Sequence, residues 1–357
     1  MRSKVYFSDF KIRNQERDAK IYKIDRLCQA AGMGELISKA DLTAVKLHFG
    51  EKGNEGYINP VFVRRVVDQI RALSAEPFLT DTNTLYVGER QDAVHHLKLA
   101  VEHGFDYAVV NAPLVIADGL KGDNYREISL KSKHYSSVRI ANDILAADSM
   151  VVLSHFKGHP IAGFGGALKN LAMGCAPAAG KKQQHQEKPF YDQSKCIGCG
   201  ACRRQCAFEA PYLKDGKAYL DCSLCVGCGK CVSVCPVHAI SMDSPTQSEA
   251  FLERLVEYAK GAVENKKGKV FYVNFLMKIT PLCDCFVFSN EPVTNDIGIL
   301  ASNDPVAVDK ACFDLLKKQM GRDVFHELTP HVPALRQITY GEEIGLGSSN
   351  YELIEVH

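Results

Sequence analysis

Eight of the fourteen cysteines in this 357-residue chain fall into two runs with the same spacing, C-x2-C-x2-C-x3-C. Three thiolates on one short loop suit three iron corners of a cubane cluster, and in this pattern the fourth cysteine of each run ligates the other cluster. The spacing therefore predicts two [4Fe–4S] clusters as cofactors. The two predicted ligand sets are Cys196, Cys199, Cys202 and Cys235, and Cys225, Cys228, Cys231 and Cys206.

Other uses of these cysteines fit the pattern less well. Paired C-x2-C units also bind zinc, but two tetrahedral zinc sites explain the doubled array poorly. A disulfide framework is disfavoured because nothing in the sequence indicates secretion. The first run has Ala207 where proline is usual, which removes no ligand. Cys222 lies three residues before Cys225, and we interpret it as a thiol outside both ligand sets.

A second group of candidate residues follows predicted strands outside the cysteine runs. One strand ends near His48, and another ends at His155, with His159 shortly beyond. Because strand carboxyl ends meet at one edge of an α/β sheet, we expect these histidines and Lys169, together with Cys283 and Cys285 of a later segment, to line one cleft within reach of a cluster. The histidines are candidates to bind a metal or to transfer protons. The alternative is that they are unrelated polar residues of surface loops.

The segment "GFGGALKN" places three glycines, Gly163, Gly165 and Gly166, before a predicted helix that carries Lys169. Backbone N–H groups at such a helix start, together with Lys169, predict an anion site for a carboxylate or phosphate. The alternative is a tight turn that packs the helix against the sheet. The spacings of the P-loop and of G-x-G-x-x-G are both absent. Pro160 also excludes a helical HExxH-type zinc site at His155 and His159.

A smaller signal is the pair Cys283-x-Cys285 in "PLCDC". Two cysteines at this spacing can chelate a second metal or form a redox pair. The alternative is that both are plain buried residues, because free cysteine is often buried.

The sequence predicts an α/β fold, which would bring the candidate residues to one edge of a sheet. Apolar runs and helical periodicity alternate along the chain, which predicts a mainly parallel sheet with helices on both faces. We expect strands at 43–49, 76–81, 106–112, 149–155, 269–275, 285–289 and 297–302. We expect helices at 59–73, 89–103, 140–147, 247–265 and 303–319, whereas 331–357 show no clear pattern.

The cysteine runs interrupt this alternation, so the sequence predicts an inserted module. We expect a ferredoxin-like α+β module with two clusters at 188–243, between a first α/β part at 1–187 and a second at 244–357. The polar stretches at 180–189 and 243–248 have the composition of linkers.

Composition narrows the class of protein. The net charge of +1 argues against binding to nucleic acid or to a membrane surface as the main activity. The N-terminal segment has no apolar run long enough for a signal peptide or a membrane span. Many cysteines without an export signal predict metal binding in the reducing cytoplasm.

The segments "VKLHFGEKGNEGYINP", "SHFKGHPIAGFGGALKNLAMG", "PLCDC" and "DIGILASNDPVAVDKA" together resemble the DUF362 family of uncharacterised proteins, whose members often carry a two-cluster ferredoxin module. The resemblance implies iron–sulfur binding and a redox role, and it assigns no substrate or catalytic residue. We expect low-potential electrons to reach a site in the α/β domain or a partner, so the partner is a redox protein or a small anionic substrate. The alternative is an electron carrier or iron–sulfur sensor, with the α/β domain as a docking scaffold.

Overall fold

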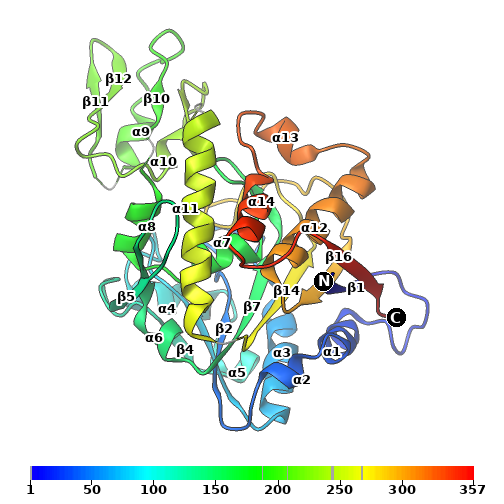
Figure 1. The fold of residues 1–357 in the computed structure, drawn as a ribbon. Helices are drawn as coiled ribbons and strands as arrows, with labels where there is room; N and C mark the ends of the chain where they lie inside the picture. The colour runs from blue at the N-terminus through cyan, green and yellow to red at the C-terminus, as the bar shows by residue number, and fades with distance from the viewer. Residues whose placement is uncertain (1, 187, 207, 243–244, 267) are drawn as a thin grey trace.

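The computed structural model describes residues 2–186, 188–206, 208–242, 245–266 and 268–357. In these residues an eight-stranded sheet forms the centre of the α/β body, in the order β16-β1-β15-β14-β7-β2-β3-β4 (Figure 1). All neighbouring strands run parallel except β15, which is antiparallel to both β1 and β14. The strands are β1 (Ser3–Asp9), β2 (Leu42–Lys46), β3 (Glu76–Asp81), β4 (Leu114–Ile116), β7 (Ser149–His155), β14 (Val270–Leu276), β15 (Gly298–Ser302) and β16 (Tyr351–Glu355).

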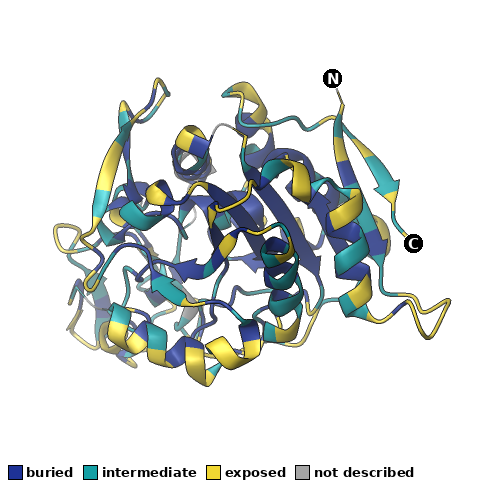
Figure 2. Ribbon diagram, turned by 90° about the horizontal axis from the view of Figure 1, so that it is seen from below, coloured by how far each residue is buried: buried dark blue, intermediate teal, exposed yellow. Residues whose placement is uncertain are grey.

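The sheet is covered by helices on both faces, as the sequence predicts. One apolar core lies between the sheet and α7, α11, α12 and α14, and a second lies between the sheet and α1, α2, α3, α4 and α5. Every residue of β7 and β14 is buried, which explains their nearly continuous apolar sequences. Figure 2 shows buried strands at the centre and helices whose outer faces are exposed. The helices are α1 (Lys20–Ala30), α2 (Met33–Leu36), α3 (Pro60–Ala72), α4 (Ala93–Glu102), α5 (Tyr107–Val110), α7 (Ala167–Ala172), α11 (Pro245–Val263), α12 (Pro305–Met320) and α14 (Arg336–Glu343).

Shorter elements connect these layers. Two small antiparallel pairs, β5 with β6 and β8 with β9, lie outside the main sheet. These elements are β5 (Tyr125–Ser129), β6 (Ser137–Ala141), α6 (Asn142–Ala146), β8 (Lys157–His159), β9 (Gly163–Gly165), α8 (Ala178–Gln184), η1 (Glu264–Lys266) and α13 (Val324–Leu328). No helix among the described residues combines the length and apolar character needed to cross a membrane.

Local capping explains where two predicted helices begin. The Asn59 side chain accepts a hydrogen bond from the Val61 N–H (2.9 Å), and proline follows at the first helical position of α3. Asp304 does the same for α12, accepting from the N–H groups of Val306 and Ala307 (both 2.9 Å). A side-chain acceptor followed by proline suits the N–H groups that a helix start leaves unpaired.

Several sequence expectations are wrong. Residues 106–112 are not a strand, because Asp106 accepts from the N–H groups of Ala108 and Val109 and so starts helix α5. Residues 285–289 form turns and not a strand. The stretch 180–189 is not simply a linker, since its first half, 180–184, belongs to α8, with Lys181 and Gln184 buried. Of the second expected linker, 243–248, the first two residues lie outside the described residues and the rest begins α11.

The cysteine-rich segment has its own small elements (Figure 1). Its entry and exit strands pair with each other, with Phe190 opposite Ser241. A small apolar cluster of Cys202, Ala218 and Ile240 lies inside it, apart from the two large cores. The elements are β10 (Phe190–Tyr191), α9 (Ala201–Arg204), β11 (Pro211–Lys214), β12 (Lys217–Leu220), α10 (Lys230–Ser233) and β13 (Ile240–Ser241).

Candidate functional site

One cavity opens at the carboxyl edge of the sheet. It holds about 970 Å³ of empty space, counted with its mouth, and is lined by residues at and beyond the ends of β2, β3 and β7. The structure brings all six expected residues to this cavity: His48, His155, His159, Lys169, Cys283 and Cys285. The argument from strand ends therefore locates the cleft, and the role of each residue stays a prediction.

The loop after β14 reaches the cavity because glycines let backbones approach closely. The Gly158 N–H donates to the Thr280 carbonyl (2.8 Å), and a Cβ at Gly158 would lie 2.1 Å from the Pro281 oxygen. A Cβ at Gly53 would lie 2.5 Å from the Val287 oxygen. Any larger residue at either position would push away the loop that carries Cys283 and Cys285.

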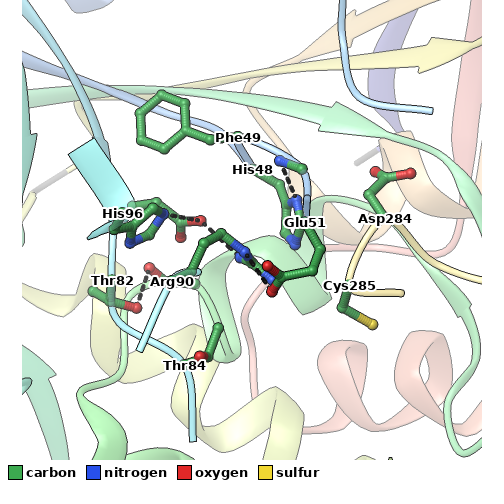
Figure 3. Close-up of polar contacts among 12 residues, drawn as sticks. His48, Phe49, Glu51, Thr82, Thr84, Arg90, His96, Asp284 and Cys285 are labelled. Carbon is green, nitrogen blue, oxygen red and sulfur yellow. Dashed lines mark hydrogen bonds and ion pairs between the residues drawn. The ribbon is translucent and has the colours of Figure 1, made fainter. Parts of the chain in front are cut away.

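Buried ion pairs hold one wall of the cavity. Asp81 lies 3.0 Å from the Lys46 ammonium and 3.5 Å from the Arg90 guanidinium, and Arg90 also pairs with Glu51 at 3.4 Å. Figure 3 shows Arg90 against the Glu51 carboxylate. Burial alone would raise the pKa of Asp81, but Lys46, the nearby histidines and Arg90 together outweigh it and keep that pKa well below its usual range. Asp81 is therefore a fixed negative charge between two cations.

His155 belongs to a second buried ion pair. Its Nδ1 lies 3.0 Å from both oxygens of Asp284, and its Nε2 lies 2.9 Å from the Met277 carbonyl. Both ring nitrogens of His155 therefore lie against acceptor atoms of the protein. Metal binding by His155 stays a prediction, and it would require one of these contacts to give way. Burial opposes ionisation of Asp284, but His155 and Lys157 hold the pKa of its carboxyl well below the usual range.

His48 and His159 have the opposite hydrogen-bonding pattern, because a nitrogen of each ring accepts from the backbone. The Nδ1 of His48 accepts from the Gly50 N–H (2.9 Å), and the Nδ1 of His159 accepts from the N–H groups of Ile161 (3.3 Å) and Ala162 (3.1 Å). Burial, followed by nearby cations, lowers the pKa of both histidines well below the ordinary value. Each ring is therefore neutral with its proton on Nε2, and it offers a hydrogen-bond donor there.

Two lysines of the cavity have no carboxylate partner among the described residues, Lys169 and Lys181. Lys181 donates instead to the Thr82 hydroxyl and to the Ala176 carbonyl, both at 2.6 Å. Burial lowers the pKa of Lys169 to about 7 and that of Lys181 to about 8. An anion in the cavity would restore the charge balance of both ammonium groups.

The glycine segment does not offer its N–H groups to an external anion. Those of Ala167 and Leu168 donate to the two carboxylate oxygens of Asp309 at 2.7 and 2.9 Å. A Cβ at Gly166 would lie 2.3 Å from the same carboxylate. The predicted cradle at Gly163, Gly165 and Gly166 is therefore wrong, and close packing explains Gly166 instead. Lys169, one turn later, still lines the cavity.

The eight cysteines of the two runs line two further cavities, of about 350 and 330 Å³. Each cavity takes three cysteines from one run and the fourth from the other run. The first is lined by Cys196, Cys199, Cys202 and Cys235, and the second by Cys206, Cys225, Cys228 and Cys231.

Backbone N–H groups point at sulfur atoms in this segment. The Ala218 N–H donates to Cys196 Sγ (3.3 Å), and the Ala239 N–H donates to Cys235 Sγ (3.2 Å). The Gly227 N–H lies 3.4 Å from Cys225 Sγ. Such donors stabilise sulfur that carries negative charge, as a metal-bound thiolate does. Cys222 lines neither cavity and is exposed.

The second cysteine cavity adjoins the cleft of the α/β body, because Cys228 lines both. The Lys230 ammonium lies 5.2 Å from the ring centre of Tyr86 and 5.6 Å from that of Phe286. Phe286 directly follows Cys285, which is joined to Cys283 by a disulfide. One nitrogen of His159 and the two sulfur atoms of this pair lie within 4.8 Å of one another.

A comparison with protein families matches residues 43–314 to the model described as "Domain of unknown function (DUF362)". The chain belongs to the DUF362 family. No curated protein matches this DUF362 protein. Among solved structures it is similar to the lactate racemase apoprotein from Thermoanaerobacterium thermosaccharolyticum, with 12% sequence identity and a TM-score of 0.43. The match covers 86% of this chain and 56% of that one, so this DUF362 chain spans little more than half the length of that relative.

Sequence reasoning missed several cavity residues of this DUF362 protein. Arg90 lines the cavity, and Glu51 pairs with it from behind the wall; both lie in the loops that follow β3 and β2, where the rule about strand ends could have found them. Lys181 and His185 line the cavity. They were not predicted because they lie in a stretch with the composition of a linker. The feature that marks these charged residues is their burial, which is seen only in the folded chain.

Proposed function

We propose that this DUF362 protein is an iron–sulfur redox protein that delivers low-potential electrons into the cavity of its α/β body. The observation that carries the proposal is the pairing of the eight cysteines into two cavities, with one cysteine exchanged between the runs. Two [4Fe–4S] clusters need this exchange, whereas two zinc sites built from adjacent C-x2-C units do not. When bound, the clusters would supply one-electron transfer.

The cysteine environment fits such a cofactor. Burial raises the pKa of Cys231 to about 12, so its thiolate needs a positively charged partner such as iron. The N–H groups of Ala218, Gly227 and Ala239 supply hydrogen bonds to sulfur. Among the described residues, four cysteines line each cavity, no histidine lines either one, and the one carboxylate is Asp192 beside the first.

The proposed division of the chain is an α/β domain in two parts, 1–187 and 244–357, with a cluster module at 188–243 between them. Pairing of the entry strand β10 with the exit strand β13 supports an insertion, because inserted units join their hosts where their ends lie close together. The separate apolar cluster of the module supports the same division.

The proposed ligand of the cavity is a small anionic compound. Lys169 and Lys181 support this choice, because each is cationic when protonated and neither has a carboxylate partner among the described residues. Cys228 lines the same cavity, so a ligand bound there would lie beside the second cysteine set. This arrangement favours a redox reaction in the body over a carrier that uses the body only for docking.

The grouping of the cysteines into two ligand sets is tested by replacing Cys206 with serine and, as a control, Cys222 with serine. After anaerobic reconstitution with iron and sulfide, the wild type should hold about eight irons per chain and absorb broadly near 400 nm, and reduction should bleach this band. Cys206→Ser should lose about half of the iron, because it removes a thiolate from the second cavity. The matched control Cys222→Ser should keep all of it. Zinc without a 400 nm band, or loss of iron in Cys222→Ser, would contradict the proposal.

A further inference from the structure

We infer that Cys283 and Cys285 are a redox-active pair that takes up two electrons and two protons in the cavity of the α/β body. The inference rests on the proposed function, because the electrons come from reduced [4Fe–4S] clusters. It goes further by placing a two-electron acceptor, built from this chain's own residues, where the cluster module meets the body.

The location of the pair is the first argument. Both cysteines line the cavity that Cys228 also lines, so the pair and one member of the second cysteine set face the same cavity. The contact is direct, because Lys230, two residues after Cys228, lies over the rings of Tyr86 and Phe286. Phe286 is bonded to Cys285, whose carbonyl accepts from the Tyr86 hydroxyl at 3.3 Å. A reduced cluster in the second cavity would therefore lie near the disulfide, with Lys230, Tyr86 and Phe286 in contact between them.

The surroundings of the sulfur atoms favour the reduced form. The Cys285 N–H donates to Cys283 Sγ at 3.3 Å. A nitrogen of His159 lies within 4.8 Å of both sulfurs, and its neutral ring carries a proton on Nε2. The ammonium of Lys169 lines the same cavity. Hydrogen-bond donors and a positive charge stabilise a thiolate, and a pair whose reduced form is stabilised accepts electrons more readily.

The proposed step is balanced with the groups named. The Sγ–Sγ bond breaks, each sulfur gains one electron, and each takes one proton from water that enters through the mouth of the cavity. Two [4Fe–4S] clusters, each a one-electron carrier, are oxidised in the same step and are reduced again by a low-potential one-electron donor. Two such clusters in one chain match the two electrons that a disulfide requires.

A metal held by His159, Cys283 and Cys285 is the competing use of these atoms, and the hydrogen bonds argue against it. Because Nδ1 of His159 accepts from two backbone N–H groups, Nε2 carries the proton and has no lone pair for a metal. A metal-bound histidine usually donates from its second nitrogen, which is the reverse arrangement. The adjacent carboxylate of Asp284 is already paired with His155 and Lys157.

The test measures how many electrons the full, anaerobically reconstituted chain takes up, and it labels the thiols that reduction sets free. Titration with titanium(III) citrate should require about four electrons in the wild type, two for the clusters and two for the pair. Cys283→Ser should require about two, with unchanged iron content, and the exposed-cysteine control Cys222→Ser about four. Peptide mass spectrometry after alkylation with N-ethylmaleimide should find Cys283 and Cys285 modified only after reduction.

Further measurements keep the inference falsifiable if Cys283→Ser folds poorly. Trapping in the wild type needs no variant, and Cys228→Ser should leave the pair as a disulfide under the same reductant. Cluster-loaded wild type that takes up only about two electrons, or whose pair is alkylated equally before and after reduction, would overturn the inference but not the proposed function. A stoichiometric extra metal lost in Cys283→Ser would also overturn it. A chain that binds no clusters would overturn both.

Discussion

The α/β body and the cysteine module are held together by different means. The body has two large apolar cores, one on each face of its sheet, and its strands β7 and β14 are buried along their whole length. Among its described residues, the module's own apolar cluster has three buried members, Cys202, Ala218 and Ile240. So small a core cannot offset the conformational entropy of about 50 ordered residues. The comparison indicates that the body folds by burying apolar surface, whereas the module depends on what its cysteines bind.

Removing metal should therefore separate the two regions, and this is the largest effect that we expect. In a reconstituted chain treated anaerobically with an iron chelator, amide hydrogen exchange in β10, β11, β12 and β13 should become nearly unprotected, because binding free energy is folding free energy in such modules. Amides of β7 and β14 should stay protected. Persistent protection of the module without metal would show that its fold does not depend on its ligands.

Inside the body, the cavity wall is held by buried ion pairs and not by apolar contacts alone. Arg90 is 3% exposed and faces two buried carboxylates, Asp81 and Glu51. Arg90→Met should lower the free energy of unfolding of the body by about 3–5 kcal/mol, because it leaves Glu51 without its cation and leaves Asp81 with Lys46 alone. Urea unfolding followed by circular dichroism measures this effect.

A surface ion pair serves as the matched control for Arg90. Arg322 pairs with Glu327, and both side chains are about half exposed. Arg322→Met should change the free energy of unfolding by less than about 1 kcal/mol. Equal effects of the two substitutions would mean that the buried charges of the cavity wall add no more to stability than a surface pair.

The sequence predicted what depends on local spacing and missed what depends on distant parts of the chain. Spacing within each run was enough to group the eight cysteines as the two cavities do, because each loop positions three of them. The anion cradle failed because Asp309, more than 130 residues away in sequence, occupies the N–H groups of Ala167 and Leu168. The antiparallel direction of β15 likewise depends on its neighbours β1 and β14, which no local pattern reveals.

The affinity of the cavity for an anion should depend on pH, and we expect this effect to be smaller than those above. Lys169 binds an anion only as an ammonium, and burial lowers its pKa to about 7. Affinity for sulfate, which does not titrate in this range, should be full below pH 7 and should fall as the pH rises through 7 and then 8, where Lys181 also loses its proton. Calorimetry on the cluster-loaded chain at pH 6, 7 and 8 measures this dependence.

A variant of Lys169 and a control variant of an exposed lysine sharpen that measurement. Lys169→Gln should weaken sulfate binding about tenfold at pH 6, about 1.4 kcal/mol, and should remove most of the change near pH 7. Lys182→Gln alters an exposed lysine of α8 and should leave the affinity unchanged. Equal affinities of both variants and the wild type would show that the cavity does not bind anions through Lys169.

The central claim is that the module holds two [4Fe–4S] clusters, and native mass spectrometry of the anaerobic wild-type chain tests it most directly. The account predicts one dominant species, the 357-residue chain plus two Fe4S4 units. Denaturation should release this mass and leave the bare chain. A dominant species that carries only zinc, or that saturates with one Fe4S4 unit after reconstitution, would contradict the account.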